Sequence, residues 1–433
     1  MFTTYQEALN WIHGRLKFGV KPGLKRMEWL LEKMDFPEKN IPIIHVAGTN
    51  GKGSTISYML HMLTEAGYDV GTFTSPYIET FNERISVNGK PISDQEMLQL
   101  ANDVKPFVDQ AEETDLGGPT EFEIITTMMF LYFGKYHQPD FLLLETGLGG
   151  RLDSTNIVTP ILSIITNVGY DHMNILGSTI SEIAAEKAGI IKQGIPVLTG
   201  AENEEVLAVL TKTAEEKQAP LLKIGQDFQI LSSAHHEKGE LFTMKTAHKK
   251  YDHLSIMMKG QHQIKNAALA IAAVDYLNHQ EKTSLNAEQI SKGIGKAFWM
   301  GRFEQIYNNP KVIIDGAHNK EGIESLINTV KRHYPNQKIH ILYSALKDKE
   351  YAEMINRLTS IATSICFTTF DFPRAASSEE LFSVCDFNEK SNSASWSQAI
   401  EKMLDVYKNK EDLILITGSL YFISSIREYM KKK

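Results

Sequence analysis

The stretch of sequence that decides the fold is residues 41–67, "IPIIHVAGTNGKGSTISYMLHMLTEAG". It begins with a short run of Ile and Val, passes through a glycine-rich loop, and ends in a segment with apolar residues at helical spacing. This order predicts a strand, a loop and a helix, the usual setting of a phosphate-binding loop. The loop differs from the general pattern G-x-x-x-x-G-K-[ST], because Gly53 lies between Lys52 and Ser54.

The loop contains the residue types that phosphate binding requires. Gly48, Gly51 and Gly53 give the backbone the freedom to turn its N–H groups toward phosphate oxygens. Lys52 supplies a positive charge, and Ser54 supplies a hydroxyl for magnesium at the start of the helix. The alternative interpretation from these residues alone is a glycine turn followed by an ordinary helix N-cap.

Length and composition indicate an ordinary globular protein. The chain has 433 residues, which predicts two domains. A net charge of -8 and the absence of a long basic run argue against a nucleic-acid partner. Cys366 and Cys385 have no metal-binding spacing, no signal peptide is recognised, and no apolar run approaches the ~20 residues that span a bilayer. We therefore expect a cytoplasmic protein that does not enter a membrane.

Strand-like and helical segments alternate along most of the chain. Continuous apolar strands separated by helices indicate a parallel sheet that is covered on both faces. The predicted strands of the first block are residues 41–48, 69–75, 141–147, 161–167 and 195–200. Residues 221–258 are more polar and alternate, which predicts antiparallel strands, and a helix is expected over residues 264–277.

A second alternating block begins near residue 310. Its predicted strands are residues 311–319, 338–345, 364–370 and 413–419. The predicted fold class is therefore α/β, with a large N-terminal phosphate-loop domain built on a mostly parallel sheet and a smaller, Rossmann-like C-terminal domain. We expect an ATP-binding domain over residues 1–297 and a second α/β domain over residues 298–433.

Three of the predicted strands end in loops that carry reactive side chains: "GTNGKGS" (48–54), "ETGLGGRLD" (145–153) and "TNVGYDH" (166–172). Ligands of open α/β sheets bind beyond the carboxyl ends of the strands, so these loops predict one shared site. Glu145 ends a buried strand beside the phosphate loop, as a magnesium ligand would. The alternatives are that Glu145 caps the following turn and that His172 is structural.

Together these motifs resemble the folylpolyglutamate and dihydrofolate synthases, a branch of the Mur-ligase-like ATP-dependent amide ligases. The wider ligase group has a loop closer to G-T-N-G-K-T-T, whereas the loop with Gly53 is similar to the folate branch. The matching segments occur in the family's order from residue 48 to residue 422. They are "GTNGKGS" (48–54), "TSP" (74–76), "FNERIS" (81–86), "ETGLGGRLDSTN" (145–156), "DHMNILGSTISEIAAEKAGIIK" (171–192), "GQHQIKNAALA" (260–270), "GRFE" (301–304), "DGAHN" (315–319) and "TGSLYF" (417–422).

The resemblance implies an enzyme that uses ATP to add L-glutamate to a folate. The γ-phosphoryl group would pass to a substrate carboxylate, and the amine of glutamate would attack the acyl phosphate and release phosphate. Addition of the first glutamate to dihydropteroate is left open, as are the preferred folate form and the tail length. The implied partners are small molecules, with ATP expected between the two domains of a monomer.

The resemblance also implies individual roles. Two magnesium ions are expected, one held by Ser54 and Glu145 and one by Ser75, Glu145 and His172, and a monovalent-cation requirement is left open. Lys187 matches the lysine that family members carry as a carbamate, although from the residues alone it is interpreted as a solvated helix residue. Lys52, Lys187, Glu145 and His172 form the implied catalytic set. The implied ATP-binding residues are Thr49, Asn50, Gly51, Lys52, Gly53, Ser54, Asn266, Arg302 and Asp315.

The substrate-binding residues follow from the same resemblance. Ser75, Tyr77, Arg84 and Glu123 would lie on the side of the pterin-bearing substrate, and His318 and Ser419 on the side of the incoming glutamate. The chain departs from many relatives at Tyr77, where a His is common, and at Met300, where a Pro is common. The first departure leaves the preferred folate open.

Two other functions are compatible with a phosphate loop. A ligase of the cell-wall branch would join amino acids to a UDP-sugar peptide, but Gly53 and "GLGGRLD" argue against it. A nucleotide switch would bind ATP or GTP without ligation. Glutamate-dependent phosphate release in the presence of a folate distinguishes all three.

Overall fold

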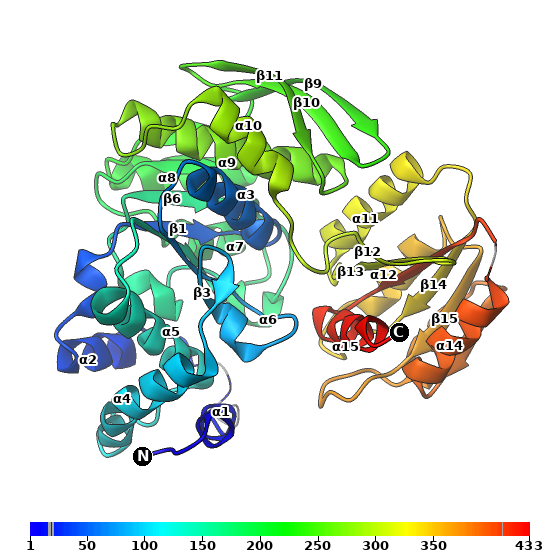
Figure 1. The fold of residues 1–433 in the computed structure, drawn as a ribbon, viewed down its shortest axis with the longest axis horizontal. Helices are drawn as coiled ribbons and strands as arrows, with labels where there is room; N and C mark the ends of the chain where they lie inside the picture. Colours follow the sequence, from blue (N-terminus) through cyan, green and yellow to red (C-terminus); the bar gives the residue numbers. More distant parts are fainter. Residues whose placement is uncertain (16–18, 20, 409) are drawn as a thin grey trace. The chain divides into compact units, whose positions relative to one another are not determined.

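The computed structural model describes residues 1–15, 19, 21–408 and 410–433. The chain divides into two compact units (Figure 1). The first unit comprises residues 1–232, 242–254 and 265–297, and the second comprises residues 233–241, 255–264 and 298–433. The second unit therefore includes two short segments that precede residue 298. The boundary between residues 297 and 298 stays a prediction.

The first unit is built on one eight-stranded sheet with the order β4-β3-β2-β5-β1-β6-β7-β8. The strands from β2 to β8 in this order are parallel, and β3 and β4 form an antiparallel edge. All five strands predicted for the first block are confirmed. The strands are β1 Ile43–Ala47, β2 Val70–Phe73, β3 Ile85–Val87, β4 Lys90–Pro91, β5 Phe141–Glu145, β6 Leu162–Ile165, β7 Val197–Thr199 and β8 Leu221–Lys223.

Helices cover both faces of this sheet, and Figure 1 shows α3 and α5 on opposite sides of it. Every residue of β1 and β5 is buried, as expected for central parallel strands. The helices are α1 Tyr5–His13, α2 Lys25–Lys33, α3 Lys52–Glu65, α4 Asp94–Glu112, α5 Glu121–Leu131, α6 Met173–Leu176, α7 Ile180–Ala188, α8 Glu204–Glu216, α9 Gln261–His279 and α10 Ala287–Lys296. Short turns of 3-10 or π-helix are η2 Pro37–Asn40, η3 Phe81–Arg84, η4 Tyr132–Tyr136 and η5 Ser154–Ile157.

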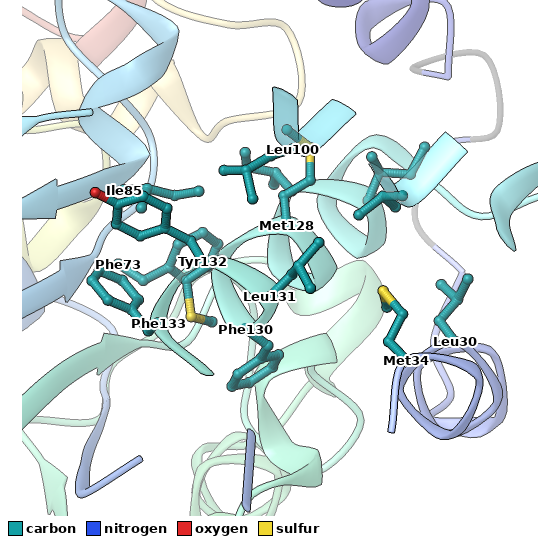
Figure 2. Close-up of a cluster of buried hydrophobic side chains, with 14 of the residues drawn as sticks. Leu30, Met34, Phe73, Ile85, Leu100, Met128, Phe130, Leu131, Tyr132 and Phe133 are labelled. Carbon is teal, nitrogen blue, oxygen red and sulfur yellow. The ribbon is translucent and has the colours of Figure 1, made fainter. Parts of the chain in front are cut away.

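A large apolar cluster joins α1, α2, α4 and α5 to one face of the sheet. Figure 2 shows part of it, with side chains of α5 and η4 beside Phe73 of β2, Ile85 of β3 and Leu100 of α4. Met128 of α5 lies fully buried within this cluster. Because burial of such side chains is the main favourable term in folding, the cluster fixes α5 against the strands that end at the site.

Three short strands form a separate small sheet with the order β11-β10-β9: β9 Gln229–His236, β10 Gly239–Lys245 and β11 Lys250–Ile256. Residues 237–238 and 246–249 connect them, and connections this short join antiparallel strands. The prediction of antiparallel strands over residues 221–258 is thus confirmed for these strands. It is wrong for residues 221–223, because they form β8, which pairs parallel to β7 in the large sheet. The helix expected over residues 264–277 is α9.

The second unit contains a six-stranded sheet with the order β12-β13-β17-β14-β15-β16. β12 is antiparallel to β13 and the other pairs are parallel, with an apolar cluster on each face. This arrangement confirms the second α/β block and the fold class. The strands are β12 Glu304–Asn308, β13 Lys311–Asp315, β14 Ile339–Tyr343, β15 Ser364–Thr368, β16 Lys390–Ser393 and β17 Leu413–Thr417. The helices are α11 Lys320–His333, α12 Tyr351–Leu358, α13 Ser378–Ser383, α14 Trp396–Val406 and α15 Leu420–Lys431.

Within the described residues, no helix combines the length and the apolar character needed to cross a lipid bilayer.

Met128→Ala should lower the free energy of unfolding by about 2–5 kcal/mol, because it removes buried atoms and leaves a cavity. Met128→Leu is the matched control, since it keeps the volume and should cost less than ~1.5 kcal/mol. Urea unfolding followed by circular dichroism measures both. Equal midpoints for the two variants would contradict tight packing at this position.

Candidate active site

The loop between β1 and α3 has the backbone of an anion-binding turn. Gly51 is the N-cap of α3 and has a φ of 86°, a left-handed conformation that favours glycine. A Cβ at this position would lie 2.5 Å from Oδ1 of Asn266, so a side chain has no room there. The first turn of α3 begins with Lys52, Gly53 and Ser54. Backbone N–H groups at the start of a helix point out along its axis, an arrangement that binds anions.

The loop after β6 holds the phosphate loop in place. The backbone N–H of Thr49 donates to the carbonyl of Asn167 (3.1 Å), and that of Asn50 donates to Asn167 Oδ1 (2.8 Å). Thr166 Oγ1 donates to the Asn50 carbonyl at 2.6 Å. The sequence indicated that "TNVGYDH" belongs to the site, but this supporting role is found only in the structure.

Lys52, Glu145 and Ser75 meet at the carboxyl ends of β1, β5 and β2. The Nζ of Lys52 lies 3.8 Å from Oε1 of Glu145 and donates to the Gly48 carbonyl at 3.0 Å. The backbone N–H of Ser75 donates to Oε2 of Glu145 at 3.1 Å. Glu145 is only 4% exposed, so its carboxylate lies in a low-dielectric setting beside a cation.

The "GLGGRLD" loop (147–153) packs directly against α7. A Cβ on Gly150 would lie 2.7 Å from the carbonyl oxygen of Glu186, so only glycine permits this approach. The backbone N–H of Arg151 donates to the same carbonyl (2.7 Å), and its guanidinium pairs with the Glu186 carboxylate (2.6 Å). The loop thereby fixes the turn of α7 that carries Lys187.

A hydrogen-bond chain ties this loop to the central strand. Asp153 accepts from the backbone of Leu148 (2.7 Å) and from Thr155 Oγ1 (2.5 Å). Thr155 Oγ1 lies 2.9 Å from Nε2 of His45 on β1, so the imidazole donates from Nε2 when the hydroxyl donates to Asp153. Burial lowers the pKa of His45 to about 3, with a further contribution from Lys192. His45 is therefore neutral at physiological pH.

Lys187 is 3% exposed, so its interpretation as a solvated helix residue is wrong. It shares the inward face of α7 with Ile183, Ala184 and Ala188, and this helical spacing was a usable signal of burial. Burial lowers the pKa of Lys187 to about 7, and repulsion from Lys52 adds to the effect.

Acidic groups oppose this shift in the pKa of Lys187, namely Asp171, Asp153 and Glu186. The amine of Lys187 therefore interacts electrostatically with the phosphate-loop lysine and with three carboxylates. A lysine with a pKa near 7 is largely neutral at slightly alkaline pH, and a neutral amine is a nucleophile.

His172 follows Asp171 at the start of α6 and has a left-handed backbone with a φ of 51°. Asp171 Oδ1 accepts from the His172 N–H at 2.9 Å, and the imidazole is 40% exposed. Its proposed role as a metal ligand stays a prediction.

The oxygen atoms of Glu145 and Ser54 are suitable ligands for a magnesium ion that binds together with a nucleotide. Within the described residues, no three His, Cys, Asp or Glu side chains come together as a self-sufficient metal site. Magnesium, however, usually takes one or two protein carboxylates and completes its shell with phosphate and water. Glu145, with the hydroxyl of Ser54 in the first turn of α3, fits that pattern.

Among the residues expected on the pterin side, Arg84 and Tyr77 lie close together in the structure. Glu123 instead contacts other residues. The Arg84 guanidinium lies 5.4 Å from the ring centres of both Tyr77 and Phe81. Glu123 is 1% exposed, accepts from the Thr120 N–H in a capping box, and pairs with Arg26. Its role in substrate binding stays a prediction.

Glu121, which the sequence did not single out, is the carboxylate beside Arg84 (3.4 Å), and it also contacts Nδ1 of His13 (3.0 Å). The segment "TEFE" (120–123) contains both acids, and the capping pattern S/T-x-x-E distinguishes them because it includes Glu123 and not Glu121. The pattern identifies Glu123 as the residue that caps the start of α5, and Glu121 is the acid that pairs with Arg84.

In the second unit, the loops after β13 and β17 meet, because these strands are parallel neighbours. Asp315 is buried and accepts from the backbone N–H groups of Phe303 and Ala317, both at 2.8 Å. Burial raises the pKa of Asp315, whereas the Arg302 guanidinium opposes the change. His318 Nδ1 donates to the Gly316 carbonyl at 2.7 Å, and Ser419 is the buried N-cap of α15.

Comparison with known proteins shows that both halves of the chain match domains of the Mur ligases. Residues 46–274 match the Mur ligase middle domain, and residues 301–420 match the Mur ligase, glutamate ligase domain. With the phosphate loop and its buried acid and lysine, these matches define the class as an ATP-dependent ligase of the Mur type.

Individual relatives narrow the class. The chain is 51% identical over 434 residues to the dihydrofolate synthase/folylpolyglutamate synthase of Bacillus subtilis strain 168, covering 100% of both chains. It is 34% identical to the folylpolyglutamate synthase of Lacticaseibacillus casei, covering 98% of each. The structure of Mycobacterium tuberculosis folylpolyglutamate synthase complexed with ADP and AMPPCP matches with a TM-score of 0.92 at 26% identity, covering 99% of each chain. The chain belongs to the dihydrofolate synthase/folylpolyglutamate synthase family.

Lys187→Met should make stability less dependent on pH. Because the folded-state pKa of about 7 lies below the unfolded value of ~10.4, the unfolded chain binds more protons between these values. The free-energy cost of burying Lys187 is largest below pH 7, where the buried amine is protonated. This cost decreases as the pH rises above 7, because the buried amine loses its charge. In CO2-free buffer, the free energy of unfolding of the wild type should therefore rise by up to ~1.4 kcal/mol per pH unit between pH 7 and 9, relative to that of Lys187→Met. Parallel melting temperatures of both proteins over this range would contradict the shifted pKa.

Proposed function

We propose that this chain uses ATP to join L-glutamate to a carboxylate of a reduced folate, releasing ADP and phosphate. The observation that carries the proposal is the grouping of a phosphate loop, a strand-end carboxylate and a buried lysine in one family-typical site. The name of the B. subtilis relative supports a second activity, addition of the first glutamate to dihydropteroate.

The reaction requires activation because an amide does not form spontaneously from a carboxylate in water. ATP transfers its γ-phosphoryl group to the substrate carboxylate, and the glutamate amine then displaces phosphate from the acyl phosphate. In our proposal, the N–H groups of residues 49–54 and the Nζ of Lys52 hold the phosphates and stabilise the charge on the transferring group. Asn266 would bind the same nucleotide from the first unit.

Residues of the second unit have their own proposed roles. Arg302 and Asp315 would bind ATP, while His318 and Ser419 would bind the incoming glutamate. The parallel pairing of β13 with β17 supports the last pair of roles, because it brings the two loops to one edge. On the folate side, Ser75, Tyr77, Arg84 and Glu123 would contact the pterin-bearing substrate.

Two magnesium sites are part of the proposal. Ser54 and Glu145 would hold the first ion, and Ser75, Glu145 and His172 the second. When bound, magnesium would neutralise charge on the phosphates. The buried carboxylate of Glu145 beside the loop supports this assignment.

We further propose that Lys187 is carbamylated. The ammonium group would first lose one proton, and the neutral amine would then add to CO2 to form N–COO⁻ and release a second proton. Over both steps the side chain changes from a cation into an anion. A pKa near 7 supports this step, because an ordinary lysine is almost wholly protonated at that pH. The conversion would also replace repulsion from Lys52 with attraction.

Further assignments stay predictions. We propose a cytoplasmic monomer with domains over residues 1–297 and 298–433, and a monovalent-cation requirement remains to be measured. Neither nucleic acid nor a membrane is among the proposed partners.

The function is tested with purified protein, ATP, magnesium and L-glutamate. We expect phosphate release that depends on glutamate and on tetrahydrofolate, with a glutamylated product by mass spectrometry. Dihydropteroate as the alternative substrate tests the second activity. Release only with a UDP-muramyl peptide would identify a cell-wall ligase instead, and nucleotide binding without ligation would identify a switch.

Lys187→Ala and Lys187→Arg should both lose most turnover, about 100-fold or more, as expected when a charge-stabilising group is removed. Lys187→Arg is the matched control, since it keeps the cation but cannot form the carbamate. ¹³C-bicarbonate should give a carbamate NMR signal in the wild type alone. Near-normal turnover of Lys187→Arg, or the same signal in both proteins, would contradict carbamylation.

A further inference from the structure

Two arginine–glutamate pairs lie at the first turn of α5, and their geometries differ. Arg26 Nε donates to both carboxylate oxygens of Glu123, at 2.8 Å and 3.1 Å, and the same carboxylate caps the helix. Arg84 Nη2 lies 3.4 Å from Oε1 of Glu121, which is longer than the ~2.7–2.9 Å of a strong charge-assisted hydrogen bond. The first pair therefore stabilises the start of the helix, whereas the second holds its guanidinium less tightly.

Aromatic rings and a histidine surround the pair of Arg84 and Glu121. The guanidinium lies 5.4 Å from the ring centres of Tyr77 and Phe81, which contact each other edge to face. Oε2 of Glu121 lies 3.0 Å from Nδ1 of His13, so an arginine and a histidine contact different oxygens of this carboxylate. The side chains of Arg84 and Glu121 are 10% and 12% exposed, and charges in such a setting interact more strongly than at an open surface.

The sheet places Arg84 beside the proposed site of phosphoryl transfer. Phe73, the last residue of β2, lies opposite Ile85 of β3 on one side and opposite Leu144 of β5 on the other. Arg84 and Glu145 are the next residues at the same edge of the sheet. Their Cα atoms are therefore about two strand spacings apart, or ~10 Å at ~4.8 Å per strand.

Hydrogen bonds of two consecutive residues connect these positions. The backbone N–H of Thr74 donates to the carbonyl of Arg84 at 3.1 Å, and the N–H of Ser75 donates to Oε2 of Glu145 at 3.1 Å. Because Glu145 would hold the magnesium of the ATP phosphates, the carboxylate that receives the phosphoryl group would lie close to this row of residues.

The first turn of α5 lies at the same edge. A Cβ on Gly147, in the loop that follows Glu145, would lie 2.5 Å from the ring of Phe122, so helix and loop are in direct contact. Glu121 is the neighbour of Phe122 in this turn. Both members of the looser pair are thus held near Glu145 by contacts within the first unit.

A folate substrate carries a suitable anionic group close to its reacting group. Its terminal glutamate has an α- and a γ-carboxylate, separated by a short aliphatic chain, and ligation uses one of them. The other keeps its charge throughout the reaction. The pterin ring is farther away, because the p-aminobenzoyl group lies between it and both carboxylates. A guanidinium can donate to two carboxylates at once, since it is planar and carries several N–H groups.

We propose that Arg84 binds the carboxylate of the terminal glutamate that is not phosphorylated. Glu121, in contact with His13, is the positioning residue for Arg84. The inference rests on the proposed ligation of glutamate to folates, and it adds a group that selects substrates by their second carboxylate. Tyr77 and Phe81 support the guanidinium, and its long contact with Glu121 lets it take a second anionic partner.

The test compares tetrahydrofolate with its two mono-amides, in each of which one carboxylate of the glutamate is a carboxamide. The mono-amide that still accepts glutamate keeps the reacting carboxylate and lacks only the second charge. In the wild type, kcat/KM for tetrahydrofolate should exceed that for this mono-amide about tenfold, as expected for a hydrogen bond to a charged group. Arg84→Gln should nearly abolish this preference. Partial misfolding would lower both values alike and leave their ratio unchanged.

Variants of Glu121 test the positioning role. Glu121→Ala should lower the ratio about threefold, because Arg84 loses a partner that orients it. Glu121→Gln should retain most of the preference, since its amide oxygen still accepts from Nη2. A higher ratio in Glu121→Ala would overturn the positioning role, because it would show that Glu121 competes with the substrate. Lys90→Gln is the control, since it removes a positive charge from an exposed position on β4 and should leave the ratio unchanged.

The remaining outcomes are also decisive. If neither mono-amide accepts glutamate, their inhibition constants make the same comparison, because Arg84→Gln should weaken the one that retains the second carboxylate and not the other. Equal effects of Arg84→Gln on all of these compounds would overturn the proposal and indicate a contact with the pterin or p-aminobenzoyl group. A wild type that does not add glutamate to tetrahydrofolate would instead contradict the proposed function.

Discussion

The parallel pairing of β1 with its two neighbours is the constraint on which the rest of the site depends. Val46 lies opposite Glu145 of β5 on one side and opposite Ile164 of β6 on the other. Three strands in this register end at the same edge of the sheet, so their loops must meet. Lys52, Glu145 and the support from Asn167 follow from this pairing, because each lies within a few residues of a strand end.

Lys187 illustrates how the packing of a neighbouring loop against α7 accompanies a change in the pKa of a side chain near this edge. Gly150 lets the "GLGGRLD" loop touch α7, and Arg151 fastens the loop to Glu186. Lys187 lies on the same turn of α7 and is buried, and exclusion of water lowers the pKa of an amine. The glycines of this loop thus contribute to reactivity without contacting the reacting group.

Much of the fold was predictable from the sequence. Periodicity located the strands that carry the loops, because parallel strands are continuous apolar runs, and α9 stood out as a long apolar helix. The burial of Lys187 was missed, although its helical spacing with the buried apolar residues of α7 indicated it, because a lysine is usually exposed. The roles of Glu121 and Glu123 were not separated, although the capping pattern that starts at Thr120 includes only Glu123. Their tertiary partners, Arg84 for Glu121 and Arg26 for Glu123, are found only in the structure.

The hydrogen-bond chain from Asp153 through Thr155 to His45 has a consequence for how the enzyme responds to acidity. With a pKa of about 3, the imidazole of His45 stays neutral at physiological pH. The imidazole beside the "GLGGRLD" loop therefore stays uncharged near neutrality, whereas the amine of Lys187, with a pKa of about 7, changes its charge there.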